Sequence, residues 1–512
     1  MIVKKMKYIF LLIFTLQNYN FCCEECCDYC EECWNNCWKN STTDQNSSLQ
    51  GGNSINNNSK KGKEIIDKNF KLNKIKPNNN DGSCWRKGLA NIGATCYMNA
   101  TLQCFAHIPE FVTFFRKEKQ VQDIIKNYQN MEQYNLTGAF AELLQNLYPT
   151  NLENMKNKTY YEPNNFKNTI SQMDPLFKGI AANDAKDLVN FLIMTLHGEL
   201  NKVPQNQKNN NNDNLLPNQT TNKQFMFNSF TKKFKNENDS IISNLFYALN
   251  CSITKCINCN VTSYNYQIYF FLIFPLEEVR KFKLTSNNGF NNNGLNNNFN
   301  NNDTVDIYDC FNFDNRINIM QGDNAMYCPF CQLTCGSSMR TILATGPNIL
   351  IIILNRGKGK EFDVKLNFSE QLNLCNYIEL KDAGTQYELF GVITHIGESG
   401  MSGHFIAYCK DLWENNWYKY NDAIVSKVEN FKTEVVDFAM PYLLFYKLKK
   451  NNMSQNNNNN NMFYNFNNII QNNNNNMLIN NNMINPPFNY MNPNNNMFFP
   501  NNNMFFPNQF KQ

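Results

Sequence analysis

Long runs of asparagine limit how much of this chain can form a hydrophobic core. In these runs asparagine is mixed with lysine, serine and glycine, or broken by methionine and phenylalanine, so few large apolar side chains remain to offset the entropy of ordering the backbone. We therefore predict disordered segments at residues 40–82, about 203–224, about 287–302 and 450–512. The predicted folded region is 83–449, and the two internal segments interrupt it.

The first 39 residues combine a short apolar run with a cluster of cysteines. Three lysines precede the apolar run at residues 8–16, which is too short to span a bilayer and has the length of a signal-peptide core. Seven cysteines follow within residues 22–37, mostly three or four apart, as along one helical face. Three interpretations stay open: thiol-metal binding, a weak membrane anchor reinforced by acylated cysteines, and export by a secretory signal. We expect a cytoplasmic protein, with membrane association or a nuclear location as alternatives.

The charge balance and the cysteine content narrow the classes of partner and chemistry. Lysine and arginine total 47 and aspartate and glutamate total 43, a net charge of +4, so no overall field favours nucleic acid, and we expect none as a partner. The 19 cysteines are clustered rather than evenly spread. This distribution indicates metal or thiol chemistry rather than a disulfide framework.

Residues 88–103, GLANIGATCYMNATLQ, contain a candidate nucleophile. The turn-forming residues Asn91, Gly93 and Thr95 precede Cys96, and apolar residues recur at helical intervals after it, so a helix should start at Cys96. At a helix start, unpaired N–H groups and the helix dipole favour a thiolate, the form that attacks a carbonyl carbon. The alternative is an ordinary buried cysteine in a helix.

Two CxxC pairs, Cys256 with Cys259 and Cys328 with Cys331, indicate a metal site. Together they supply four thiolates for a tetrahedral zinc, and a closed site of this kind is structural because it leaves no position for water. The alternative, a nucleic-acid-binding zinc ribbon, needs a basic and aromatic surface that the flanking residues lack. Two further cysteines lie nearby in the sequence, Cys251 and Cys335.

Hydrophobic periodicity predicts a mixture of helices and strands. The expected helices lie around 139–147 and at 184–200, and strand-like content is found at 241–249, 347–356, 388–395 and 403–410. The run at 347–356 is apolar on both faces, as in a buried central strand. Sequence pattern alone thus predicts an α+β protein with a zinc-stapled insertion.

Two more segments accompany Cys96. Residues 403–408 read GHFIAY, and residues 417–425 read WYKYNDAIV. Only four histidines occur in the chain: His107 and His197 on predicted helices, and His395 and His404 on the paired strands.

These segments resemble the ubiquitin-specific proteases, deubiquitinases with a papain-like cysteine peptidase core. Residues 88–103 match the cysteine box GLxNxGxTCYMNxxLQ without a gap, and the other two match the GHYxAY and W-x-x-[FY]-[DN]-D-x-x-V segments. The resemblance implies that Cys96 is the nucleophile and His404 the base. It also implies that the Asn421 carbonyl accepts a proton from His404 Nδ1 and orients the ring, with Asp422 supplying negative charge. The alternative for Asn421 and Asp422 is ordinary turn chemistry.

Further site residues follow from the same resemblance. Asn91 matches the oxyanion donor, together with the Cys96 backbone N–H. Asp184 lies in ANDAKDL, which is similar to the QQDAxEFL segment, and its carboxylate would face the arginine-containing tail of ubiquitin; the alternative for Asp184 is a helix N-cap. His395 would line the channel for that tail.

The implied fold is the thumb, palm and fingers arrangement over residues 83–449, with zinc-binding fingers at about 250–345. The implied function is hydrolysis of the bond after the C-terminal glycine of ubiquitin, through a Cys-His-Asn triad and a thioester. Ubiquitin and ubiquitinated proteins are the expected partners, and structural zinc is the expected cofactor. Two alternatives stay open: a weakly active or inactive ubiquitin-binding scaffold, and a papain-like peptidase with another substrate.

Overall fold

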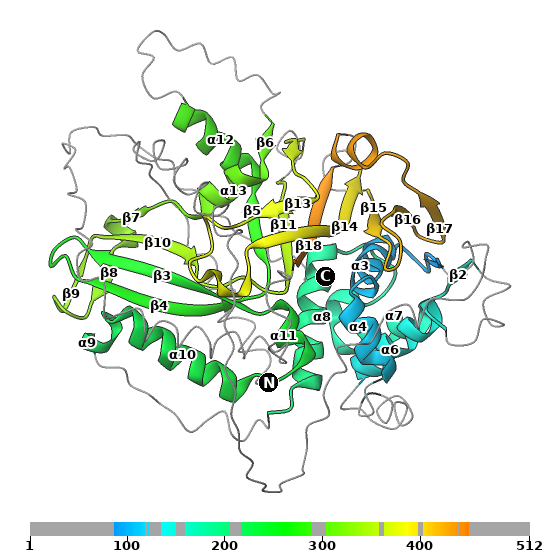
Figure 1. Ribbon diagram of the computed structural model, residues 1–512, viewed down its shortest axis with the longest axis horizontal. Helices are drawn as coiled ribbons and strands as arrows, with labels where there is room; N and C mark the ends of the chain where they lie inside the picture. The colour runs from blue at the N-terminus through cyan, green and yellow to red at the C-terminus, as the bar shows by residue number, and fades with distance from the viewer. Residues whose placement is uncertain are drawn as a thin grey trace, which may run out of the picture.

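The computed structural model describes residues 86–117, 121, 135–149, 159–203, 217–287, 304–357, 363–397, 403–437 and 440–449. The predicted segments 1–39 and 40–82, residues 288–303 and the asparagine-rich tail lie outside this set, so the structure does not test the readings of the amino-terminal cysteines. The described residues form the predicted α+β arrangement (Figure 1). Over these residues no helix has both the length and the apolar character needed to cross a membrane.

A large mixed sheet forms the centre of the molecule. Its strand order is β17-β16-β15-β14-β18-β11-β5, and β13 pairs with β14. Strand β11 is apolar on both faces and all but its last residue are buried, which confirms the predicted central strand. The strands are β5 (Leu272–Pro275), β11 (Ile349–Asn355), β13 (Gln371–Asn373), β14 (Gln386–Ile396), β15 (His404–Lys410), β16 (Trp417–Asn421), β17 (Ile424–Lys427) and β18 (Pro441–Leu448).

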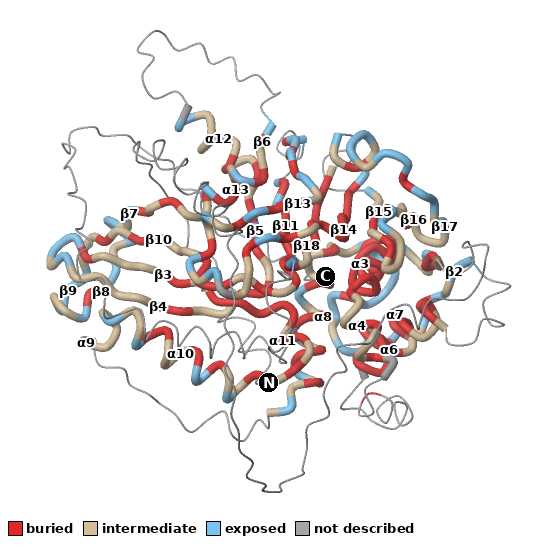
Figure 2. The backbone as a smooth tube through the Cα atoms, viewed as in Figure 1, coloured by how far each residue is buried: buried red, intermediate tan, exposed pale blue. Residues whose placement is uncertain are grey.

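A helical lobe packs on one face of this sheet, and α3 is its central element. Every residue of α3 is buried, and Figure 2 shows it as a continuous buried segment beside β14 and β15. The predicted helices around 139–147 and at 184–200 are confirmed as α6 and α8. The helices of the lobe are α3 (Cys96–Ala106), α4 (Pro109–Lys117), α6 (Asn135–Leu147), α7 (Asn164–Met173), α8 (Ala185–Leu200) and α11 (Ile241–Phe246).

Side chains fix where two of these helices start. Asp184 precedes α8 and accepts a hydrogen bond from the Lys186 backbone N–H at 2.9 Å, as an N-cap does. The Glu199 carboxylate, near the end of α8, accepts bonds from the backbone N–H groups of Leu136 and Thr137 at the start of α6. The two helices are therefore tied together by a buried polar contact as well as by apolar packing.

A second, four-stranded sheet extends away from the helical lobe, and its order is β4-β3-β10-β7. Helix α10 packs along β4, and the β8-β9 hairpin lies at the far end of the sheet (Figure 1). The elements are α9 (Pro217–Thr220), α10 (Lys223–Glu237), β3 (Ala248–Cys256), β4 (Thr262–Tyr269), β7 (Asn318–Met320), β8 (Met326–Cys328), β9 (Leu333–Cys335) and β10 (Ser337–Leu343).

The chain returns to the large sheet between β4 and β7. Strand β5 pairs with β11 there, so the predicted fingers range of about 250–345 is interrupted by a part of the palm. The elements of this return are β5, α12 (Leu276–Asn287), β6 (Val305–Asp306), α13 (Ile307–Asp314) and, later in the chain, β12 (Leu366–Asn367), which pairs with β6. The pair β1 (Gly88–Leu89) and β2 (Tyr160–Tyr161) and short helical turns at 175–177, 322–324, 381–383 and 432–436 complete the fold.

Two predicted segments differ from the structure. Residues 241–249, predicted as a strand, begin with helix α11, and only Ala248 onward enters β3. The cause is a capping box, in which Ser240 and Ser243 each accept the backbone N–H of the other at 3.0 Å and so start a helix. The predicted insertion at 203–224 is also shorter than expected, because α9 begins at Pro217.

Candidate active site and metal centre

Asn91 organises the loop that leads into α3. Its side-chain oxygen accepts hydrogen bonds from the backbone N–H groups of Gly93 at 3.3 Å and Thr95 at 3.1 Å. Gly93 has a φ of +115°, a conformation that glycine adopts without strain. These contacts turn the chain so that Cys96 becomes the first residue of α3, as the sequence predicts.

The Cys96 side chain is enclosed, and this changes its chemistry. Only 6% of the residue is exposed, and burial raises the pKa of the Cys96 thiol above its ordinary value. A backbone hydrogen bond with Phe405 opposes this shift in pKa, and the negative charge of Asp422 adds to it. Burial therefore opposes the thiolate that the helix start is expected to favour.

His404 and Asn421 form a direct pair on neighbouring strands. His404 begins β15, Asn421 ends β16, and His404 Nε2 lies 2.6 Å from Asn421 Oδ1. Because an amide oxygen only accepts, Nε2 carries the proton and Nδ1 is the basic nitrogen. The predicted pairing of His404 with Asn421 is found, but the ring nitrogen that binds Asn421 is Nε2 and not the predicted Nδ1. The backbone contact between Cys96 and Phe405 places the thiol beside the residue that follows His404.

Asp422 connects the strands to the nucleophile helix. Its carboxylate accepts a hydrogen bond from Asn91 Nδ2 at 3.0 Å and from Asn99 Nδ2 at 2.8 Å, and it lies 3.9 Å from His404 Nε2. Asp422 has a φ of +50°, and its backbone oxygen accepts the Leu89 N–H at 2.9 Å. Asp422 is therefore more than a turn residue, since it joins both halves of the site.

Asn99 is a site residue that the sequence analysis did not single out. It lies three residues after Cys96 and therefore on the same side of α3. Its amide also donates to the backbone oxygens of Leu89 and Ala90, both at 3.1 Å. The sequence signal that could have identified Asn99 is its helical spacing, three residues after Cys96. Asn91, in turn, directs one amide N–H at Asp422.

Asp184 and His395 lie near this site. Asp184 accepts the Tyr442 hydroxyl at 2.6 Å in addition to capping α8, which confirms its N-cap role. His395 is buried on β14; burial lowers its pKa, the Asp184 carboxylate opposes that effect and His404 adds to it. Gly403 makes room for this ring, because a Cβ on Gly403 would lie 2.2 Å from His395 Cε1. The structure therefore places His395 near both Asp184 and His404.

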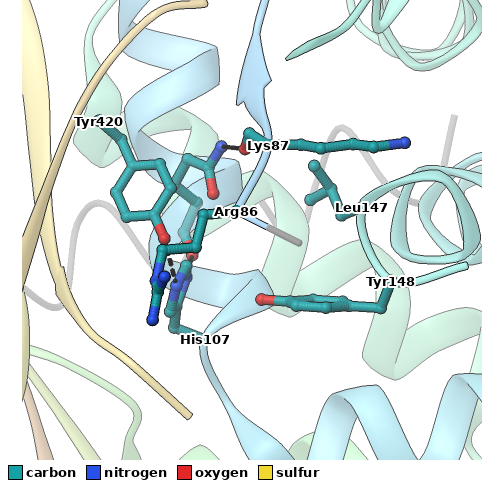
Figure 3. Close-up of a pocket in the computed structure, with 7 residues that line it drawn as sticks. Arg86, Lys87, His107, Leu147, Tyr148 and Tyr420 are labelled. Carbon is teal, nitrogen blue, oxygen red and sulfur yellow. Dashed lines mark hydrogen bonds between the residues drawn. The ribbon is translucent and has the colours of Figure 1, made fainter. Parts of the chain in front are cut away.

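A small polar pocket lies at the carboxyl end of α3, apart from the catalytic residues (Figure 3). His107 Nδ1 donates to the Gln103 backbone oxygen at 2.7 Å, and the Tyr420 hydroxyl donates to His107 Nε2 at 3.0 Å. Burial lowers the pKa of His107, which favours this neutral form. Since Tyr420 precedes Asn421, this contact ties β16 to the far end of the nucleophile helix.

The two CxxC pairs meet at the far end of the second sheet, as predicted. The four sulfurs of Cys256, Cys259, Cys328 and Cys331 all lie within 4.8 Å of one another. Cys256 and Cys331 are 3.7 Å apart, and Cys259 and Cys328 are 3.8 Å apart. A zinc–sulfur bond of about 2.3 Å gives a tetrahedron with edges of about 3.8 Å. The cysteines therefore fit a tetrahedral metal ion.

Each CxxC pair forms a similar turn. The Asn260 backbone N–H donates to the Cys256 oxygen at 3.0 Å, and the Gln332 N–H donates to the Cys328 oxygen at 2.8 Å. Asn260 and Gln332 both have positive φ, +59° and +57°. The two turns thus present their sulfurs in the same way and give the site an approximate internal symmetry.

Comparisons with known proteins agree with this geometry. A family model described as ubiquitin carboxyl-terminal hydrolase matches residues 87–446. Ubiquitin carboxyl-terminal hydrolase 2 of Bos taurus is 25% identical over 369 residues, which cover 70% of this chain and 55% of that protein. Ubiquitin carboxyl-terminal hydrolase 21 of Homo sapiens is 26% identical, over 70% of this chain and 61% of that protein. The chain thus spans little more than half the length of these relatives.

Solved structures share the fold. A chain of the SAGA DUB module of Ubp8, Sgf11, Sus1 and Sgf73 bound to monoubiquitin aligns with a TM-score of 0.51 and 20% identity, over 72% of this chain and 70% of that one. The same module bound to ubiquitin aldehyde aligns with a TM-score of 0.50 and 20% identity, over 72% and 71%. Because the family match covers most of the chain, this protein belongs to the ubiquitin carboxyl-terminal hydrolase family, as a ubiquitin-specific protease.

Proposed function

We propose that this protein is a thiol-dependent deubiquitinase that hydrolyses the bond after the C-terminal glycine of ubiquitin. The observation that carries the proposal is the convergence of Cys96, His404, Asn421 and Asp422 from a helix and two strands. Family membership supports the same reaction class. The proposed partners are ubiquitin and ubiquitinated proteins.

The proposed reaction starts from the thiol form of Cys96, because burial raises the pKa of this thiol. His404 Nδ1 takes the thiol proton as the sulfur attacks the glycine carbonyl carbon, and the imidazolium is stabilised by Asn421 and Asp422. The leaving amine receives this proton when the carbon–nitrogen bond breaks. A water then gives a proton to His404 and attacks the thioester carbon. The carbon–sulfur bond breaks, the Cys96 sulfur takes the proton back from His404, and ubiquitin is released with a free carboxylate.

Asn91 is the proposed side-chain donor to the oxyanion. Its amide has a second N–H besides the one bound to Asp422, and its oxygen is held by the loop, so the amide is fixed in orientation. The Cys96 backbone N–H is the proposed second donor, as the first amide of α3. A fixed donor stabilises the tetrahedral intermediate without reorganisation during the reaction.

Asp184 and His395 are the proposed contacts for the tail of ubiquitin. The Asp184 side chain is 27% exposed, so it can attract an arginine of the tail while it caps α8. His395 lies close to both Asp184 and His404, which supports a place along the path of the tail to Cys96.

Cys256, Cys259, Cys328 and Cys331 would hold a zinc ion. Zinc bound by four thiolates has no open position and would supply a structural link rather than a catalytic one. The ion would join the turn after β3 to the β8-β9 hairpin.

The test uses the full chain and ubiquitin with a thiol-reactive C-terminal group. We expect one ubiquitin to be added, by intact mass, and the adduct to be absent in Cys96→Ala. Cys104→Ala, which changes another buried cysteine of α3, is the matched control and should still form the adduct. No adduct from a folded wild-type protein would favour the ubiquitin-binding scaffold, and a ubiquitin titration would then decide that alternative.

A further inference from the structure

The metal centre has a fifth thiol. Cys335 Sγ lies 3.3 Å from Cys256 Sγ, closer than Cys256 lies to Cys331 or Cys259 lies to Cys328. Cys335 is half-buried at the end of β9, so solvent reaches it. We propose that Cys335 is a reserve ligand of the metal centre, which takes the coordination position of Cys256 when that thiol is lost.

Backbone pairing holds Cys335 at this place. Ser337 pairs with Cys256 in the ladder of β10 and β3, and the Ile257 N–H donates to the Gly336 oxygen at 2.9 Å. Cys335 ends β9, two residues before the partner of Cys256, so the backbone contacts of Gly336 and Ser337 bring it beside Cys256. Backbone hydrogen bonds therefore help to hold Cys335 next to the cluster.

The geometry selects Cys256 as the ligand that Cys335 replaces. The two sulfurs are 3.3 Å apart, a displacement that a change of side-chain rotamer covers. Cys335 also interacts with Cys331, the ligand paired with Cys256, and no contact between Cys335 and Cys259 is found among the described residues. Replacement of Cys256 therefore keeps the other three ligands in place.

The exchange balances without an oxidant. The bond between the metal and the Cys256 sulfur breaks, the departing thiolate takes up the proton that the Cys335 thiol releases, and a bond between the Cys335 sulfur and the metal forms in its place. The metal keeps four thiolates and its charge. The inference concerns metal binding alone, so it stands or falls separately from the proposed deubiquitinase activity.

The first test is a thiol footprint of the full chain loaded with zinc. N-ethylmaleimide labelling is read for each cysteine by peptide mass spectrometry. In the wild type we expect Cys335 to react while the four ligands are protected. In Cys256→Ser, zinc should slow labelling of Cys335 by about tenfold or more, because a coordinated thiolate is shielded. Cys259→Ser is the matched control, and there Cys335 should react at the wild-type rate. Equal labelling of Cys335 in Cys256→Ser and the wild type would overturn the proposal.

The second test counts thiolates directly, by the absorption spectrum of bound Co²⁺. A variant with all five cysteines changed to serine serves as the blank for the other cysteines of the chain. Cys256→Ser should keep the four-thiolate spectrum, whereas Cys259→Ser and the double variant Cys256→Ser with Cys335→Ser should show three thiolates. If Cys256→Ser loses metal or a thiolate to the same extent as Cys259→Ser, whether or not it stays folded, Cys335 is not a reserve ligand.

Discussion

Replacement of Asp422 by asparagine tests how charge supports the catalytic histidine. The carboxylate lies 3.9 Å from His404 Nε2, and at an effective dielectric constant of about 20 it would attract an imidazolium by about 4 kcal/mol. The His404 side chain is 37% exposed, so solvent screening reduces this attraction to about 2 kcal/mol. Since the imidazolium forms only after the thiol gives up its proton, Asp422→Asn should lower kcat/KM roughly 30-fold.

The new amide would also disturb its neighbours. The amide has one NH₂ group in place of one of the two carboxylate oxygens. This NH₂ group would face the amide of Asn91 or Asn99, each of which now donates a hydrogen bond to the carboxylate. Loss of one such bond should lower the free energy of unfolding by about 1–3 kcal/mol. Rates therefore have to be measured at a temperature at which urea titrations show both proteins folded.

The assay is hydrolysis of a fluorogenic amide of ubiquitin. Asp323→Asn makes the same chemical change at an exposed position in the fingers and should leave kcat/KM unchanged. A folded Asp422→Asn protein with kcat/KM within about twofold of the wild type would refute the electrostatic reasoning.

Three further predictions address the surroundings of the site. Tyr420→Phe leaves buried His107 Nε2 without its donor, so the free energy of unfolding should fall by about 1–3 kcal/mol in urea; an unchanged midpoint would contradict the pairing. Gly88→Ala would place a Cβ 2.4 Å from the Ala423 carbonyl oxygen, so the melting temperature should fall; a melting temperature equal to that of the wild type would argue against this close contact. Burial raises the pKa of the Cys96 thiol above its ordinary value, so its alkylation by iodoacetamide, followed by peptide mass, should be slow at about pH 7 and rise with pH; a rate already constant with pH at about pH 7 would reveal a thiolate.

Local sequence predicted the parts of the site that depend on neighbours in the chain. The turn before Cys96 and the apolar spacing after it were sufficient to place the start of α3. The continuous apolar run of β11 predicted a central strand, and the two CxxC pairs predicted a four-sulfur cluster. The turn before Cys96, the apolar run of β11 and the spacing within each CxxC pair are local, whereas the meeting of the two pairs joins cysteines 69 positions apart.

The remaining features depend on contacts between distant residues. Enclosure of Cys96 raises its pKa, and that enclosure comes from β15, about 300 positions later in the chain, so a helix-start argument could not detect it. The choice of His404 Nε2 rather than Nδ1 depends on the relative position of two strands. The helix at 241–246 depends on one reciprocal pair of serines, which a periodicity over a short segment does not reveal.

The candidate site residues lie on two kinds of support: His404 and Asn421 on paired strands of one sheet, and Cys96 on a helix packed against that sheet. His404 and Asn421 lie on adjacent hydrogen-bonded strands, whose separation of about 4.8 Å is almost invariant in proteins. Cys96 lies on a helix packed against that sheet, and helix-on-sheet packing tolerates small sliding motions. A partner that presses on the helical lobe would therefore change the distance from sulfur to imidazole while the imidazole and its amide stay aligned. The distance from the Cys96 sulfur to the His404 ring thus depends on how the helical lobe packs, whereas the ring and its amide partner are held by one sheet.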